Sequence, residues 1–158
     1  MTTSEYEGRT PEAGAAQGFR RVAVGIDFSP SSLRALEVAR SRFPGAEVLL
    51  LHVVQASAAS AVAGSTPMAA FDPALLESLE RSDAERLRGL LRPGESYQQA
   101  VGEPVAALLE AVNEWDADLL VVGTHARGAL EYFFLGSTAE KLVARSHVPV
   151  SYTHLTLP

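Results

Sequence analysis

Cysteine is absent from this chain of 158 residues. Disulfide bonds, thiolate nucleophiles and zinc–thiolate sites are therefore excluded. Long apolar runs are also missing, since no stretch approaches the roughly 18 apolar residues that a membrane-spanning helix needs. The opening residues, MTTSEYEGRTPEAGAAQGF, contain neither the basic region nor the apolar region of a signal peptide. These absences favour a cytoplasmic protein that does not partner a membrane.

Positive charge is in the minority, with 13 Lys and Arg residues against 19 Asp and Glu residues and a formal net charge of −6. An acidic chain repels the phosphate backbone of nucleic acids, so we expect no nucleic-acid partner. Apolar residues make up 47% of the chain and charged residues 20%, which is typical of a globular protein. The length predicts one domain with a core of its own.

Several catalytic and phosphate-binding motifs are missing. No Gly-Lys pair occurs, so there is no Walker loop, and the dinucleotide motif G-x-G-x-x-G is absent. The nucleophile elbow G-x-S-x-G is absent too. The histidines show no metal-ligand spacing; they are His52, His125, His147 and His154. We therefore expect neither a metal site nor a dedicated catalytic residue.

Strand-like and helix-like segments alternate through the rest of the chain. The segment 19–27 ends a β-branched run in Gly-Ile-Asp and predicts a strand. A helix is predicted next, with Ser29 as its cap, Pro30 at its first position and an end at Pro44. The continuous apolar run at 46–55 indicates a strand buried on both faces, as in a parallel sheet.

The same alternation continues to residue 150. Helices are predicted at 73–92, 104–115 and 137–146, the last with Leu142 and Val143 facing inward. Strands are predicted at 95–103, at 117–123 and from 148. This order indicates an α/β fold, an open five-stranded parallel sheet with helices on both faces, Rossmann-like. We expect residues 1–18 to be a disordered tail, 19–150 to be the domain, and 56–72 to be a loop.

Sheets of this kind bind ligands beyond the carboxyl ends of their strands, where the strand order reverses. Asp27 closes the first strand, and Gly123 closes the fourth. The Asp27 carboxylate suits a ribose hydroxyl, and it suits equally well the capping of the next helix. His52 lies inside an apolar strand, and a core histidine with satisfied hydrogen bonds is the favoured interpretation.

The stretch GTHARGALEYFFLGST, residues 123–138, ends at a predicted helix N-terminus. Free N–H groups at such an end suit phosphate, Ser137 and Thr138 add hydroxyls, and Lys141 follows one turn later. Taken alone, a plain capping box of Ser137 and Glu140 is the favoured alternative. His125 and Arg127 could face phosphates or be ordinary loop residues.

Together these segments resemble the universal stress protein family over residues 21–150. The resemblance is carried by VAVGIDFSPSSLRAL, EVLLLHVV, VGEPVAALLEAV and ADLLVVGTHARGALEYFFLGSTAEKLVARSHVPV. It implies a five-stranded parallel sheet of the adenine-nucleotide α-hydrolase type, a homodimer, and a role in stress tolerance. One branch of the family binds ATP, with the signature G-x2-G-x9-G-[ST]. Gly123 and Gly136-Ser137 fit that signature, whereas Ala126 replaces the middle glycine.

The resemblance also implies the residues of a nucleotide site. Asp27 would hold the ribose and the backbone of Val53 would contact adenine. The others would be Gly25 and Val122 beside the base, and Gly123, Ala126, Gly136, Ser137 and Thr138 around the phosphates. An alanine in a left-handed conformation costs about 1–2 kcal/mol, and a loss of about 1.4 kcal/mol weakens affinity tenfold. We therefore expect binding of ATP, alone or with Mg²⁺, that Ala126 weakens.

Two other functions remain open. The first is an interaction module of the same fold that binds no nucleotide and acts as a dimer, which Ala126 favours. The second is an adenylating enzyme of the wider superfamily, but its Ser-Gly-Gly-x-Asp-Ser and His-x-Gly-His motifs are absent. We expect no enzyme activity beyond very slow ATP hydrolysis.

The C-terminal octapeptide SYTHLTLP, residues 151–158, departs from the family pattern, in which the last strand continues with apolar residues. It resembles translated sequencing-adapter sequence. We therefore expect it not to be native, a prediction that resequencing of the locus tests.

Overall fold

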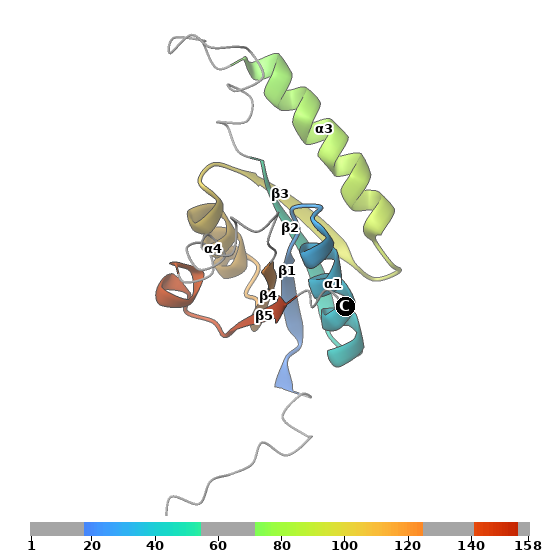
Figure 1. Cartoon of the computed structure of the whole chain (residues 1–158), viewed down its shortest axis with the longest axis vertical. Coiled ribbons are helices and arrows are strands. Elements are labelled where there is room, and N and C mark those ends of the chain that lie inside the picture. Colours follow the sequence, from blue (N-terminus) through green and yellow to red (C-terminus); the bar gives the residue numbers. More distant parts are fainter. Residues whose placement is uncertain (1–17, 55–71, 125–140, 155–158) are drawn as a thin grey trace, which may run out of the picture.

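The computed structural model describes residues 18–54, 72–124 and 141–154. Five strands form one sheet in the order β3-β2-β1-β4-β5, and every neighbouring pair is parallel (Figure 1). The predicted open five-stranded parallel sheet is confirmed. The strands are β1 (Arg21–Gly25), β2 (Glu47–Val54), β3 (Ser96–Val101), β4 (Leu119–Thr124) and β5 (Val150–His154).

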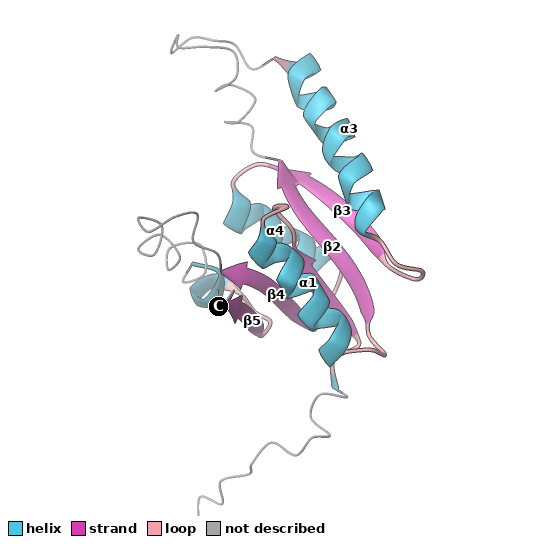
Figure 2. Cartoon of the chain, turned by 45° about the vertical axis from the view of Figure 1, so that its right-hand side comes forward, coloured by secondary structure: helices cyan, strands magenta, loops and turns pink. Residues whose placement is uncertain are grey.

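Helices cover both faces of the sheet (Figure 2). The helices α1 (Pro30–Arg42) and α3 (Pro73–Leu90) lie on one face, where Leu36 and Leu87 join one apolar cluster. On the other face lie α4 (Pro104–Glu114) and the helical residues 141–145, where Leu108 and Leu142 join a second cluster. The sheet therefore has a core on each side.

The two cores explain why β1 and β2 are apolar at successive positions. In β1, Val22 and Val24 join the cluster under α1, whereas Ala23 joins the cluster under α4. In β2, Leu50 and Leu51 divide in the same way. Successive side chains of a strand point to opposite faces, so a strand covered on both faces needs a continuous apolar run.

The helices α1, α3 and α4 each begin with a side-chain cap followed by proline. Ser29 caps α1 and Asp72 caps α3. Glu103 caps α4, where its carboxylate accepts hydrogen bonds from the N–H groups of Val105 and Ala106 at 3.1 and 2.8 Å. The hydrogen bond from Ala106, and then the one from Val105, lowers the pKa of Glu103. The predicted start of α1 at Ser29-Pro30 is confirmed.

Replacement of Glu103 by alanine should lower the melting temperature by about 3 °C at pH 7, because two helix N–H groups lose their acceptor. The pKa of Glu103 is lowered in the folded chain, so this contribution is present above the ordinary pKa of a glutamate and is lost as the pH falls through the folded value. Thermal unfolding at pH 7 and pH 3 measures it. Glu110→Ala, which removes an exposed carboxylate from the same helix, is the control; equal losses in the two variants would contradict the prediction.

Two sets of polar contacts join segments that are far apart in the sequence. Asp118, just before β4, accepts the N–H groups of Arg20 and Arg21 at 2.9 Å each, across 97 residues in the latter case. Arg40 of α1 donates to both carboxylate oxygens of Glu95, at 2.8 and 2.7 Å. The Arg40 and Glu95 side chains are only 11% and 9% exposed, so this ion pair is largely buried.

Two details near the C-terminus bear on the predictions. Leu142 is buried as predicted, but Val143 is 54% exposed, so the prediction that Val143 faces inward is wrong. Consecutive positions of a helix point about 100° apart, and only one of the two faces the sheet. The strand β5 pairs with β4 from Val150 to His154 and therefore includes part of the atypical octapeptide. Whether that octapeptide is native stays a prediction.

Candidate functional site

The strand order reverses between β1 and β4. From β1 the chain moves to β2 and β3 on one side, and it returns to β4 and β5 on the other. In sheets of this kind the usual ligand site lies beyond the carboxyl ends of the two strands at such a reversal. Asp27 follows β1 directly, and Gly123 lies at the end of β4, so the structure brings these two predicted residues to the same place.

Asp27 is exposed, and its carboxylate takes part in the start of α1. Its Oδ1 accepts the N–H of Ser29 at 2.9 Å and also the Ser29 hydroxyl. Its own N–H donates to Ser32 Oγ at 3.3 Å. The capping role that the sequence left open is thus present, whereas the ribose role stays a prediction.

Three buried serines complete the first turn of α1: Ser29, Ser31 and Ser32. The Ser32 N–H donates to Ser29 Oγ at 3.2 Å, and the Ser32 hydroxyl donates to the Ser29 carbonyl at 3.0 Å. The Ser29 and Ser31 hydroxyls lie 3.2 Å apart. Because these hydroxyls bond to one another, to Asp27 and to nearby backbone groups, the backbone around Asp27 is held closely.

Gly123 lies directly against that first turn. A Cβ placed on Gly123 would overlap the Ser31 carbonyl group and would lie 2.7 Å from the Ser32 nitrogen. All of these are backbone atoms, which cannot rotate away. The absence of a side chain at Gly123 therefore lets the end of β4 approach the first turn of α1.

Gly25, Val53 and Val122 lie near the carboxyl ends of three neighbouring strands, β1, β2 and β4. A Cβ on Gly25 would lie 3.2 Å from Val122 Cγ1. Val122 is buried in the cluster under α4, and Val53 is partly buried against the same cluster. Their side chains thus belong to the core, so any ligand contact from Val122 would involve its backbone.

His52 is a core histidine with two partners, as the sequence favoured. Its Nδ1 lies 2.7 Å from the Ile26 carbonyl oxygen, and its Nε2 lies 3.0 Å from Asp83 Oδ2 on α3. Its ring also packs against Phe28, with ring centroids 4.8 Å apart. His52 therefore joins the segment around Asp27 to a helix that comes later in the chain.

Phe28, next to Asp27, adopts a left-handed backbone with φ of 64°. That conformation costs a non-glycine residue about 1–2 kcal/mol. The Phe28 ring lies between His52 and the Arg86 guanidinium, which is 3.7 Å from the ring centroid. The sequence did not predict that Phe28, Asp83 and Arg86 lie near the site. A charged helix surface and a single aromatic residue carry no motif.

The remaining predicted site residues lie outside the described residues. They are Ala126, Gly136, Ser137 and Thr138, and the alternatives at His125, Arg127 and Glu140 lie there as well. Lys141 is described and exposed. Their roles around the phosphates stay predictions.

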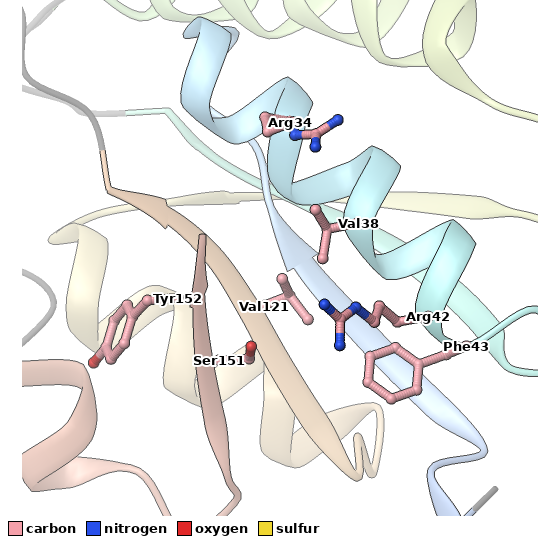
Figure 3. Close-up of a pocket in the computed structure, with 7 residues that line it drawn as sticks. All are labelled: Arg34, Val38, Arg42, Phe43, Val121, Ser151 and Tyr152. Atoms are coloured by element: carbon pink, nitrogen blue, oxygen red, sulfur yellow. The ribbon is translucent and has the colours of Figure 1, made fainter. Parts of the chain in front are cut away.

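A separate hollow of about 360 Å³ lies between α1 and the strands β4 and β5 (Figure 3). None of the predicted site residues lines it. In Figure 3 the Tyr152 ring points away from α1, whereas Ser151 lies near Val121. The lining residues are Arg34, Val38, Arg42, Phe43, Val121, Ser151 and Tyr152.

Neither a metal cluster nor a membrane helix occurs in the described ranges. No group of three or more His, Asp or Glu side chains among residues 18–54, 72–124 and 141–154 could hold a metal ion. None of the helices in these ranges combines the length and the apolar character needed to cross a bilayer.

The strand order defines a doubly wound α/β protein, a class whose usual ligand site lies at the switch point. The model of the universal stress protein family matches residues 18–153. A universal stress protein of Thermus aquaticus, from the QAH/OAS sulfhydrylase 3′ region, is 32% identical over 137 residues, which covers 84% of this chain and 96% of that one. This chain therefore belongs to the universal stress protein family.

Solved structures agree with this assignment. The structure of the hypothetical protein MJ0577 matches with a TM-score of 0.72 over 89% of this chain and 99% of that one. At 20% identity, that likeness supports the fold alone. A universal stress protein solved in complex with cAMP is 27% identical, with a TM-score of 0.56 over 87% of this chain and 98% of that one.

Proposed function

We propose that this chain binds an adenine nucleotide, ATP in particular, at the carboxyl ends of β1 and β4. We further propose that it acts as a regulator of stress tolerance in the cytoplasm. The observation that carries the proposal is that Asp27 follows β1 and Gly123 ends β4 at the switch point, where Gly123 packs against the backbone of the first turn of α1. The related protein that was solved with cAMP supports an adenine nucleotide as the class of ligand.

In this proposal different residues contact the ribose, the adenine and the phosphates of the nucleotide. The Asp27 carboxylate accepts a ribose hydroxyl, and the backbone at Val53 meets the adenine, beside Gly25 and Val122. Gly123, Ala126, Gly136, Ser137 and Thr138 surround the phosphates. Mg²⁺ enters only as the ion that accompanies the phosphates of ATP. We assign no general base, so hydrolysis is at most very slow.

A second function is an interaction module that binds no nucleotide. It is favoured by Ala126, which replaces a motif glycine, and by the Asp27 carboxylate, whose Oδ1 already accepts two hydrogen bonds from Ser29. The two functions share a homodimer as their expected assembly. β5 is an edge strand of the described sheet, and its outer side suits pairing with a second copy of the chain.

Calorimetric titration of MgATP into the purified chain tests the nucleotide proposal. We expect a dissociation constant in the micromolar range for the natural sequence. Ala126→Gly should bind about tenfold more tightly, because a left-handed conformation then costs nothing and no methyl group faces the phosphates. Titration of MgGTP serves as the control for recognition of the base.

The two functions predict different outcomes of this titration. Heat of binding from both proteins supports the nucleotide proposal. If Ala126→Gly binds MgATP and the natural chain does not, the interaction module is favoured. If neither protein binds at millimolar nucleotide, the nucleotide proposal is wrong.

A further inference from the structure

The helix α3 is held against the sheet by few apolar side chains. Of its 18 residues, Ala84 and Leu87 are buried, and Leu90 packs partly buried against the core. Its N-terminal half runs past the carboxyl edge of the sheet (Figures 1 and 2). The position of α3 therefore depends strongly on its polar contacts, and two of these lead directly to the residues on either side of Asp27.

The first contact passes through His52 to the residue before Asp27. Asp83 Oδ2 lies 3.0 Å from His52 Nε2, and the Ile26 carbonyl oxygen lies 2.7 Å from His52 Nδ1. A carbonyl and a carboxylate both only accept hydrogen bonds. Both partners of the imidazole are therefore acceptors, and the ring links α3 to the end of β1.

The second contact reaches the residue after Asp27. The Arg86 guanidinium lies 3.7 Å from the Phe28 ring centroid, within the range of a cation–π interaction. It also lies 3.8 Å from Asp83 Oδ1. The Phe28 side chain thus contacts both α3 and His52. A residue in a left-handed conformation keeps it only when its surroundings impose it.

We propose that α3 is a positioning element of the nucleotide site, and that Asp83 and Arg86 hold the Ile26–Ser29 loop so that Asp27 keeps its orientation. This inference rests on the proposed function. Asp83 and Arg86 act through His52 and Phe28 and touch no ligand themselves. Because coupling is reciprocal, a bound nucleotide favours the docked position of α3, and whatever draws α3 away weakens nucleotide binding.

The coupling suggests how the protein reports its nucleotide state. A bound nucleotide would add to the contacts that already hold α3 against the sheet, so the helix is docked more firmly in the occupied protein than in the empty one. The charged surface of α3 then differs in its mobility between the two states, which a partner can distinguish. A regulator without catalytic chemistry needs such a movable element to pass on what it has bound.

Arg86→Ala and Asp83→Ala test the inference, with Arg81→Ala as the matched control. The Arg86 side chain is 56% exposed, so its removal leaves the core intact. Arg81 lies on the same helix and pairs only with Glu77, in a pair whose side chains are 69% and 72% exposed. Asp83→Asn is the conservative variant, because its amide oxygen still accepts a hydrogen bond from His52.

The first readout needs no nucleotide. Amide hydrogen exchange of Asp27 and Ser29 reports the loop, since the Ser29 N–H is bonded to Asp27 Oδ1. We expect exchange about tenfold faster in Arg86→Ala and Asp83→Ala, as for a loss of about 1.4 kcal/mol in local stability. The Val105 amide donates to the Glu103 carboxylate at the start of α4, far from these changes in the sequence. It should exchange as in the natural chain.

The second readout is the MgATP dissociation constant. It should rise about tenfold in both alanine variants, stay within about twofold in Arg81→Ala, and recover largely in Asp83→Asn. A lower melting temperature with unchanged loop exchange and unchanged affinity would show that α3 only stabilises the fold, and would overturn the inference. If the natural chain binds no ATP, the proposed function fails, and loop exchange alone decides whether α3 holds the loop. If Asp83→Ala does not fold, Arg86→Ala decides.

Discussion

Gly123→Ala should destabilise the folded chain by about 3 kcal/mol, the upper end of the usual cost of overpacking. The added methyl group would overlap the Ser31 carbonyl and approach the Ser32 nitrogen at 2.7 Å. Backbone atoms at a helix start cannot change rotamer, so either β4 or α1 has to shift. Chemical denaturation followed by circular dichroism measures the loss, which corresponds to a fall of roughly 10 °C in melting temperature.

Gly89→Ala is the matched control for this change. Gly89 lies within α3, and a Cβ there would meet no atom within 4 Å. Alanine is the better helix former by about 1 kcal/mol, so this variant should be more stable than the natural chain. The same substitution should thus have opposite signs at the two positions. A loss below about 1 kcal/mol at Gly123 would show that β4 and α1 can separate at little cost.

Glu95→Gln should lower stability by about 2–3 kcal/mol at pH 7, because a largely buried guanidinium loses its paired carboxylate. Arg40 also donates to the Leu90 carbonyl at 2.6 Å and to Glu37 at 2.8 Å, and these bonds remain. Burial alone would raise the pKa of Glu95. The hydrogen bonds from Arg40 and from the Arg92 N–H outweigh burial, and the pKa of Glu95 is lowered overall.

The pH dependence of this effect has a definite sign. A carboxylate whose pKa is lowered in the folded chain stabilises it above the ordinary pKa and loses that contribution as the pH falls through the folded value. The difference in stability between the natural chain and Glu95→Gln should therefore be full at pH 7 and should shrink below the ordinary glutamate pKa of 4.5. A difference that stays constant from pH 7 to pH 3 would refute this explanation.

Glu77→Gln provides the comparison for the ion pair. Glu77 pairs with Arg81 at 3.0 Å, but both side chains are about 70% exposed. Exposed pairs of this kind contribute about 0.5 kcal/mol or less. Similar losses in Glu77→Gln and Glu95→Gln would mean that removal of one negative charge, and not the buried geometry at Arg40, accounts for the effect.

The fold was largely predictable because its signals are local. The run that becomes β2 is apolar at successive positions, and the Ser29-Pro30 pair marks the start of α1. The switch point followed from the alternation of strands and helices together with the family resemblance. The prediction that Val143 faces inward was wrong because an apolar side chain at the edge of a helical stripe can face water without much cost.

The candidate site was predictable only in part. Asp27 follows β1 and Gly123 lies at the end of β4, so the pairing of these two strands brings both residues to the same edge of the sheet. The contacts that shape the loop around Asp27 join Ile26, His52 and Asp83, which lie in three separate elements. No local pattern encodes such a set. Gly123 was predicted as a phosphate neighbour, whereas its closest contacts are with the backbone of α1.

The pairing of β1 with β4 has a consequence for how the chain is made. β1 lies at the centre of the sheet, yet the ribosome synthesises it first, and its second neighbour arrives only with Leu119 and Leu120. Until then one edge of β1 has no strand partner. Pairing at such long sequence separation is slow to form, and an apolar strand with an open edge invites association between nascent chains. The polysome, more than the finished protein, is therefore where this architecture is most exposed to aggregation.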